Sequence, residues 1–104
     1  MLLVIDTEVY YWKDIKWIRG DKPSKEDFKK DYVKLPIDVA PVDYLEGVFH
    51  LLNNEDNPLG SKENQEWIRK NLKPNPHTSM SVGDIVKVVD EYWIVEDVGW
   101  KKLW

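Results

Sequence analysis

Apolar runs toward both ends of the chain predict β-strands, and a polar middle section has the period of helices. Strands are expected at residues 2–5 and twice within 8–18, an aromatic and β-branched run with a turn at Lys13–Asp14. Toward the C-terminus, residues 85–95 predict a β-hairpin that turns at Asp90–Glu91. Residues 100–104 predict a last short strand or a free tail.

Three helices are expected in the middle section. The first covers about 25–33, because Ser24 can cap it and Asp27 stands three residues further on. The second begins at Asp43 and has apolar residues at the i, i+3, i+4 and i+7 positions of one face. The third runs from Ser61 to Lys73 with a narrower apolar stripe. This order of elements indicates an α+β fold with a small antiparallel sheet, a C-terminal β-hairpin and two to three short helices.

Composition changes this picture mainly through the aromatic residues. A chain of 104 residues is expected to form a single domain, 1–104, and this one contains six tryptophans and five tyrosines. Aromatic side chains supply core volume, and those on the surface are typical anchors for a protein partner. The candidate partner-binding residues are Trp12, Trp17, Trp100 and Trp104.

Charge offers an alternative for the aromatic stretch near the N-terminus. The net charge of −4 argues against non-specific binding of a polyanion. Residues 12–19 nevertheless interleave tryptophans with cations, which is the composition of a stacking platform for nucleic acid. The cations of this alternative are Lys13, Lys16 and Arg19. The same alternation also fits strands that pack their aromatics inward and leave the cations in water.

The stretch LVIDTE raises the question of a nuclease. Asp6 and Glu8 stand two residues apart, so on a strand their carboxylates share a face and could bind a divalent metal. A two-metal nuclease needs further acidic ligands and often a general base. The two histidines stand six and seven residues before the next aspartate, and neither spacing fits the later motifs of proofreading exonucleases. We therefore expect no metal site and rank a metal-dependent nuclease third.

The segment His77–Ser81 places an imidazole beside hydroxyl groups, but sequence adjacency is not the geometry of a serine nucleophile. No Gly-x-Ser-x-Gly elbow is present, and the isolated glycines form no phosphate loop. We expect the hydroxyls to satisfy backbone groups of a loop that enters a strand. Where that strand begins, Gly83 permits a tight turn and Asp84 can accept bonds from its amides. Gly83→Val should therefore damage folding.

Residue usage excludes several classes of protein. Because the chain has no cysteine, it has no disulfide, thiolate metal site or thiol nucleophile. No apolar run approaches the ~20 residues that span a bilayer, and residues 2–5 are too few for a signal peptide. We expect a soluble cytoplasmic protein, monomeric or homodimeric, with no catalytic residues and no cofactor.

Residues 77–103, HTSMSVGDIVKVVDEYWIVEDVGWKKL, resemble the C-terminal signature of the YodL-like domain family. The pattern is a His-Thr/Ser-hydrophobic-Ser segment, a small residue and Asp, a β-branched strand, a tight turn, an aromatic-Val strand and a Gly-aromatic-Lys ending. Upstream, Leu45–Phe49 and Asn53–Pro58 are similar more loosely, so the likeness covers about 44–103. The helix at Ser61–Lys73 is additional to the pattern.

The resemblance implies a small accessory protein of phages, plasmids or their bacterial hosts, without established enzymatic chemistry, that binds a host protein. The sequence therefore leads to two alternative hypotheses about function. The first is a protein-binding accessory factor that uses exposed aromatics and an acidic face. The second is a nucleic-acid-binding module that uses residues 12–19.

Overall fold

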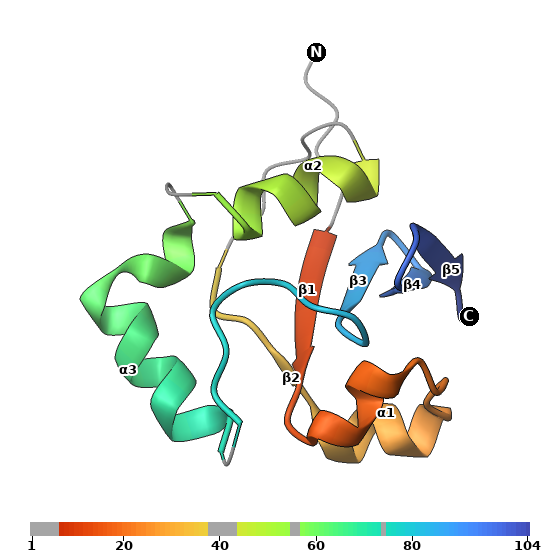
Figure 1. Ribbon diagram of the computed structural model, residues 1–104, viewed down its shortest axis with the longest axis horizontal. Helices are drawn as coiled ribbons and strands as arrows, with labels where there is room; N and C mark the ends of the chain where they lie inside the picture. The colour runs from red at the N-terminus through yellow and green to blue at the C-terminus, as the bar shows by residue number, and fades with distance from the viewer. Residues whose placement is uncertain (1–6, 38–43, 55–56, 74) are drawn as a thin grey trace.

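The computed structural model describes residues 7–37, 44–54, 57–73 and 75–104, arranged around one five-stranded antiparallel sheet (Figure 1). The fold is α+β, as the sequence predicts. In chain order the elements are β1 (Thr7–Trp12), the 3-10 helix η1 (Ile15–Arg19), α1 (Lys25–Asp31), β2 (Tyr32–Lys34), α2 (Tyr44–Leu52), the 3-10 helix η2 (Pro58–Gly60), α3 (Lys62–Asn71), β3 (Ile85–Val88), β4 (Glu91–Val95) and β5 (Trp100–Lys102).

The strand order in the sheet is β2-β1-β3-β4-β5. The three C-terminal strands follow one another as antiparallel neighbours, as expected for hairpins with short connections. β1 lies inside the sheet, because it pairs with β2 on one side and with β3 on the other. The first and last thirds of the chain are therefore joined through the pairing of β1 with β3.

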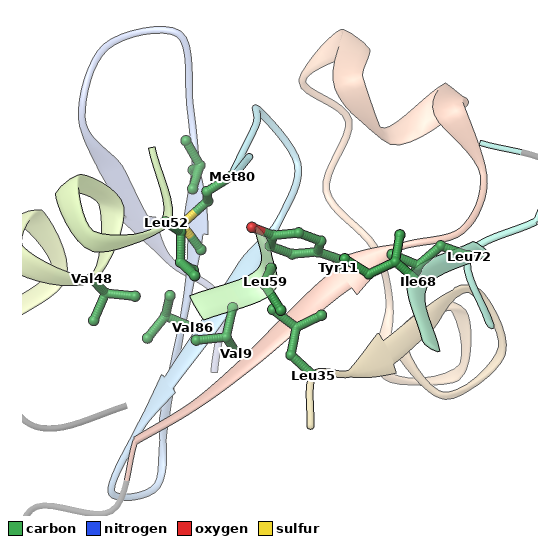
Figure 2. Packing of buried hydrophobic residues seen from close by; sticks show 11 residues of the cluster. Val9, Tyr11, Leu35, Val48, Leu52, Leu59, Ile68, Leu72, Met80 and Val86 are labelled. Carbon is green, nitrogen blue, oxygen red and sulfur yellow. The ribbon is translucent and has the colours of Figure 1, made fainter. Parts of the chain in front are cut away.

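Each face of the sheet has its own core, since successive side chains of a strand point to opposite faces. One face is covered by α2, η2 and α3, and Figure 2 shows side chains from these elements converging on Tyr11 of β1. The other face is covered by η1 and α1. Its buried residues are Trp12, Trp17, Tyr32, Ile85 and Ile94.

The starts of two helices follow local rules. Ser24 and Asp27 form a capping box at α1, in which each side chain accepts a hydrogen bond from the other residue's backbone N–H, at 3.1 and 3.0 Å. The hydroxyl of Ser61 accepts from the N–H of Asn64 at the start of α3. The predicted helices at 25–33 and Ser61–Lys73 are confirmed with slightly different ends.

The prediction of two strands within residues 8–18 is wrong. Only β1 forms there, and η1 follows it because the carboxylate of Asp14 accepts a hydrogen bond from the backbone N–H of Lys16 at 3.0 Å. The N–H of Lys13 then donates to the carbonyl of Asp31 at 2.7 Å, which directs the chain toward β2. β1 therefore pairs with β2, a strand the pattern did not predict.

The C-terminal hairpin turns one residue earlier than predicted, at Val89–Asp90. Val89 has a φ of +60°, which is costly for a β-branched residue, and it is 57% exposed. The strand predicted at 2–5 and the helix start predicted at Asp43 lie outside the described residues. In the described part of the chain, no helix combines the length and apolar character needed to cross a membrane.

Candidate functional site

A fully buried carboxylate lies where the loop after α3 enters β3. Asp84 has 0% exposure and accepts hydrogen bonds from three other residues. The backbone N–H of Trp12 donates to Oδ1 at 3.0 Å, and the N–H and hydroxyl of Ser81 donate to Oδ2 at 2.8 and 3.2 Å. Nε2 of His77 lies 3.2 Å from both carboxylate oxygens. These bonds attach the loop to β1.

His77 is positioned to carry a positive charge. Its Nδ1 lies 3.1 Å from the carbonyl oxygen of Asn75, so both ring nitrogens face oxygen atoms, and a protonated ring donates to both. Burial alone would lower the pKa of His77, but the hydrogen bond and charge of Asp84, helped by the Asn75 carbonyl, raise it above its ordinary value. The ring stacks on Tyr11 and Trp12 with centroids 4.5 and 4.1 Å apart, and both aromatic faces attract a cation.

The environment of Asp84 acts on its own pKa in two directions. The pKa of the Asp84 carboxyl is raised above its ordinary value, because complete burial outweighs the bonds from His77, Ser81 and Trp12, which act to lower it. Because every nearby donor points at the carboxylate, we describe the pair as an imidazolium facing a carboxylate. Losing one partner of such a buried pair would strongly destabilise the fold, so the pair holds the loop in this one position against β1.

The geometry of this pair differs from that of a catalytic triad. A serine nucleophile needs a histidine nitrogen that can accept its proton. Here the hydroxyl of Ser81 donates to Asp84, and both nitrogens of His77 face acceptors. The hydroxyl of Thr78 accepts from Nε2 of Gln65 at 2.7 Å. The hydroxyls of Thr78 and Ser81 therefore bind side chains, where we expected backbone groups.

Three aromatic side chains hold the same loop through their polar ends. The hydroxyl of Tyr11 donates to the carbonyl of Thr78, and the indole N–H of Trp12 donates to the carbonyl of Val82, at 2.8 and 2.9 Å. The hydroxyl of Tyr32 donates to the carbonyl of Gly83 at 2.6 Å. Burial accordingly raises the pKa of the Tyr11 and Tyr32 hydroxyls far above the ordinary value.

Two of the four candidate partner-binding tryptophans are buried, since Trp12 and Trp17 are only 3% and 5% exposed. The indole N–H of Trp17 donates to the carboxylate of Asp31 at 3.1 Å, so its polar edge is used inside the molecule. Neither indole can stack on a nucleic-acid base. The stacking platform predicted for residues 12–19 is therefore not formed.

The cations of that stretch lie on the surface or near it. Lys16 is exposed, with its Nζ 3.4 Å from Asp31 and 4.8 Å from the centroid of the Trp17 ring. Arg19 is exposed at the end of η1, and Lys13 is half-buried. These charges surround a buried indole rather than alternate with exposed ones.

Of the two early carboxylates, the structure describes Glu8, which is held by neighbouring side chains. Glu8 accepts from the hydroxyl of Tyr10 at 3.0 Å and lies 3.4 and 3.8 Å from the Nζ atoms of Lys34 and Lys87. These contacts lower the pKa of Glu8 against the opposing effect of burial. Asp6 lies outside the described residues. Within those residues, no group of three or more His, Cys, Asp or Glu could hold a metal ion.

An open cleft of about 440 Å³, here called the α2–β5 cleft, lies between α2 and the β4–β5 turn. Phe49 and Trp100 form its aromatic wall, with ring centroids 6.4 Å apart and an edge-to-face angle of 86°. Other residues that line it are His50, Ser81, Val82, Glu96 and Asp97. Of the four tryptophans proposed to bind a partner, Trp100 is the one that lines this cleft.

Trp104 is half-buried on the opposite face of the sheet. Its ring meets Phe28 and Tyr92 edge to face, with centroids 5.6 and 5.5 Å apart. Its carbonyl accepts from the N–H of Tyr92 at 2.8 Å, which fixes the C-terminus beside β4. These contacts assign Trp104 to packing at the edge of the second core.

The comparisons with known proteins found one clear relative. No family model matches the sequence, and no solved structure matches it. The chain is 51% identical over 108 aligned positions to "Uncharacterized protein R785" of Acanthamoeba polyphaga mimivirus, an alignment that covers 96% of this chain and 94% of the viral one. The chain belongs to the family of this mimivirus protein.

The described part of the chain has two further hollows on its surface. One of about 580 Å³ is lined mainly by Leu45, Val88, Val89 and Trp93, toward the start of α2. The other, of about 360 Å³, lies on the β4–β5 turn and includes Val98, which is 90% exposed. Glu96 and Asp97 line both this hollow and the α2–β5 cleft.

Sequence reasoning missed most of this surface. Phe49 lies in the apolar pattern of α2, which predicts a buried face, and Val98 carries no signal beyond its place in a short turn. One signal in the sequence could have indicated this surface. Pairs of acidic residues, Asp90–Glu91 and Glu96–Asp97, lie at the two ends of β4.

Proposed function

We propose that this protein is a small non-catalytic accessory protein of a virus or another mobile element, and that it binds a protein partner at the α2–β5 cleft. The observation that carries the proposal is the cleft itself, with Trp100 and Phe49 as its wall and the exposed Val98 beside it. Half-buried aromatics in a hollow, surrounded by polar residues, are typical of protein-binding surfaces.

The walls of the cleft are held in place before any partner arrives. Gly83 donates its N–H to the carbonyl of Val95, and Val95 donates its N–H to the carbonyl of Asp84, at 3.0 and 2.9 Å. Ser81, which lines the cleft, is bound to the buried carboxylate of Asp84. A preorganised surface loses less conformational entropy on binding, which favours recognition by this region.

Two further observations support the same class of function. The mimivirus relative makes a viral setting the simplest context for this family. The resemblance of residues 77–103 to the YodL-like domain family stays a prediction, and it points to accessory proteins of mobile elements. Nucleic-acid binding loses its main support because Trp12 and Trp17 are buried. The occupied nitrogens of His77 favour a non-catalytic role.

Site-specific photo-cross-linking tests the proposal. A benzophenone amino acid at position 98 is expected to give a defined adduct in cells that naturally express the protein, identified by mass spectrometry. The matched control carries the same group at position 70, which is exposed on α3. Trp100→Leu in the position-98 protein should reduce the adduct, with folding checked by circular dichroism. Equal adducts at both positions, or an adduct that Trp100→Leu leaves unchanged, would refute the proposal.

A further inference from the structure

We infer that the partner inserts an arginine side chain into the α2–β5 cleft, between the Trp100–Phe49 wall and the carboxylate of Asp97; this inference rests on the proposed function. The cleft combines the indole of Trp100, which meets the Phe49 ring edge to face, with the carboxylates of Glu96 and Asp97. A planar guanidinium can stack on an indole and at the same time bind a carboxylate with two N–H groups. The site therefore favours this cation over apolar or anionic groups.

The charges around the cleft leave Asp97 available for this contact. Glu96 is already paired, because its Oε1 lies 2.7 Å from the Nζ of Lys22. The hydrogen bond and charge of Lys22, with a smaller effect of Lys101, lower the pKa of Glu96. Within the described part of the chain, Asp97 has no ion-pair partner, and it is exposed. A guanidinium beside Trp100 would supply that partner.

The position of the cleft indicates that the arginine belongs to a protein. Val98 belongs to the same turn and is almost fully exposed, and it lines a second hollow that shares Glu96 and Asp97 with the cleft. A single small cation would leave the valine and the second hollow in water. A protein surface can cover the valine while its arginine enters the α2–β5 cleft, so that apolar and charged contacts form together.

Nuclear magnetic resonance with two matched peptides tests the inference without knowledge of the partner. The probes are acetyl-Gly-Arg-Gly-amide and acetyl-Gly-citrulline-Gly-amide, which differ mainly in charge. The six tryptophans give separate indole N–H signals, and that of Trp100 is assigned from Trp100→Phe. The arginine peptide should shift the Trp100 signal and bind at least about fivefold more tightly than the citrulline peptide, since a cation–π contact and a salt bridge are lost together.

Two variants test whether the carboxylate of Asp97 binds the arginine peptide. Asp97→Asn should weaken binding of the arginine peptide at least about threefold, whereas Asp90→Asn, in the exposed β3–β4 turn, should leave it unchanged. Equal binding of both peptides, a shift at Trp93 without one at Trp100, or no shift at tens of millimolar arginine peptide would overturn the inference. Cross-linking at position 98 is independent of these outcomes, so the proposed function could stand while the arginine inference fails.

Discussion

Replacing Asp84 by asparagine is the most informative change to the scaffold. The substitution preserves the size of the side chain but removes the charge that faces His77. The single oxygen of the new amide can accept from the N–H of either Trp12 or Ser81. Its NH₂ group then faces the N–H of the other residue, which is also a donor. The variant therefore removes the counter-charge of His77, so that the buried ring either loses its proton or keeps an unpaired charge, and it leaves one backbone N–H without an acceptor.

The expected loss of stability is large. Breaking a buried ion pair by removing one partner costs about 3–5 kcal/mol. A domain of this size has a total stability of about 5–15 kcal/mol, so the change removes a substantial part of it. With a shift of about 4–8 °C per kcal/mol, the melting temperature of Asp84→Asn should fall by more than about 12 °C.

Urea unfolding followed by tryptophan fluorescence measures this effect. Asp90→Asn is the matched control, because Asp90 is exposed in a turn and its loss should change stability by less than about 0.5 kcal/mol. The double variant with His77→Gln should be less destabilised than the sum of the two single variants, since each removes the same interaction. A loss below about 1 kcal/mol for Asp84→Asn, or strict additivity, would refute the account of this pair.

The stabilisation that His77 gives to the fold should decrease as the pH rises. Because the pKa of His77 is raised in the folded protein, the folded state holds this proton more tightly than the unfolded state does. The resulting stabilisation is complete below the unfolded pKa of about 6.5 and is lost as the pH rises through the folded pKa. The stability difference between the wild type and His77→Gln should therefore narrow in alkaline solution. A difference that widens above about pH 6.5 would contradict the reasoning.

The remaining predictions concern positive φ angles and use the same unfolding assay. Gly83→Ala should cost more than about 3 kcal/mol, because its Cβ would lie 2.5 Å from the carbonyl oxygen of Trp17 at a φ of +94°. Gly99→Ala, at a φ of +76° with open space around it, should cost only about 1 kcal/mol, and equal losses at the two glycines would exclude the steric explanation. Val89→Gly should stabilise the protein by about 0.5–1 kcal/mol by releasing strain at a φ of +60°, and a loss of stability there would show that Val89 is not strained.

Local features of the fold could be predicted from the sequence. The capping box of Ser24 and Asp27 lies within four residues, and the β3–β4 hairpin pairs residues separated by a short turn. The special roles of Gly83 and Asp84 were also visible, since a turn before a strand needs a positive φ and an acceptor for its amides.

Features that depend on distant segments could not be predicted. Whether Trp12 is buried depends on the carbonyl of Val82, 70 residues away in the chain, and the bond from Tyr32 to Gly83 spans 51 residues. An alternating pattern of aromatics and cations looks the same whether the aromatics face a core or water. The α2–β5 cleft likewise joins Phe49 and Trp100, which no local pattern connects.

We propose that the surface around Trp100 recognises a partner while the other aromatics form the scaffold. The most direct test compares the indole N–H signals of the protein alone and in complex with the partner recovered by cross-linking. The account predicts that the Trp100 signal shifts or broadens most, while those of the buried Trp12 and Trp17 keep their positions. An unchanged Trp100 signal in a complex that alters other indole signals would contradict the account.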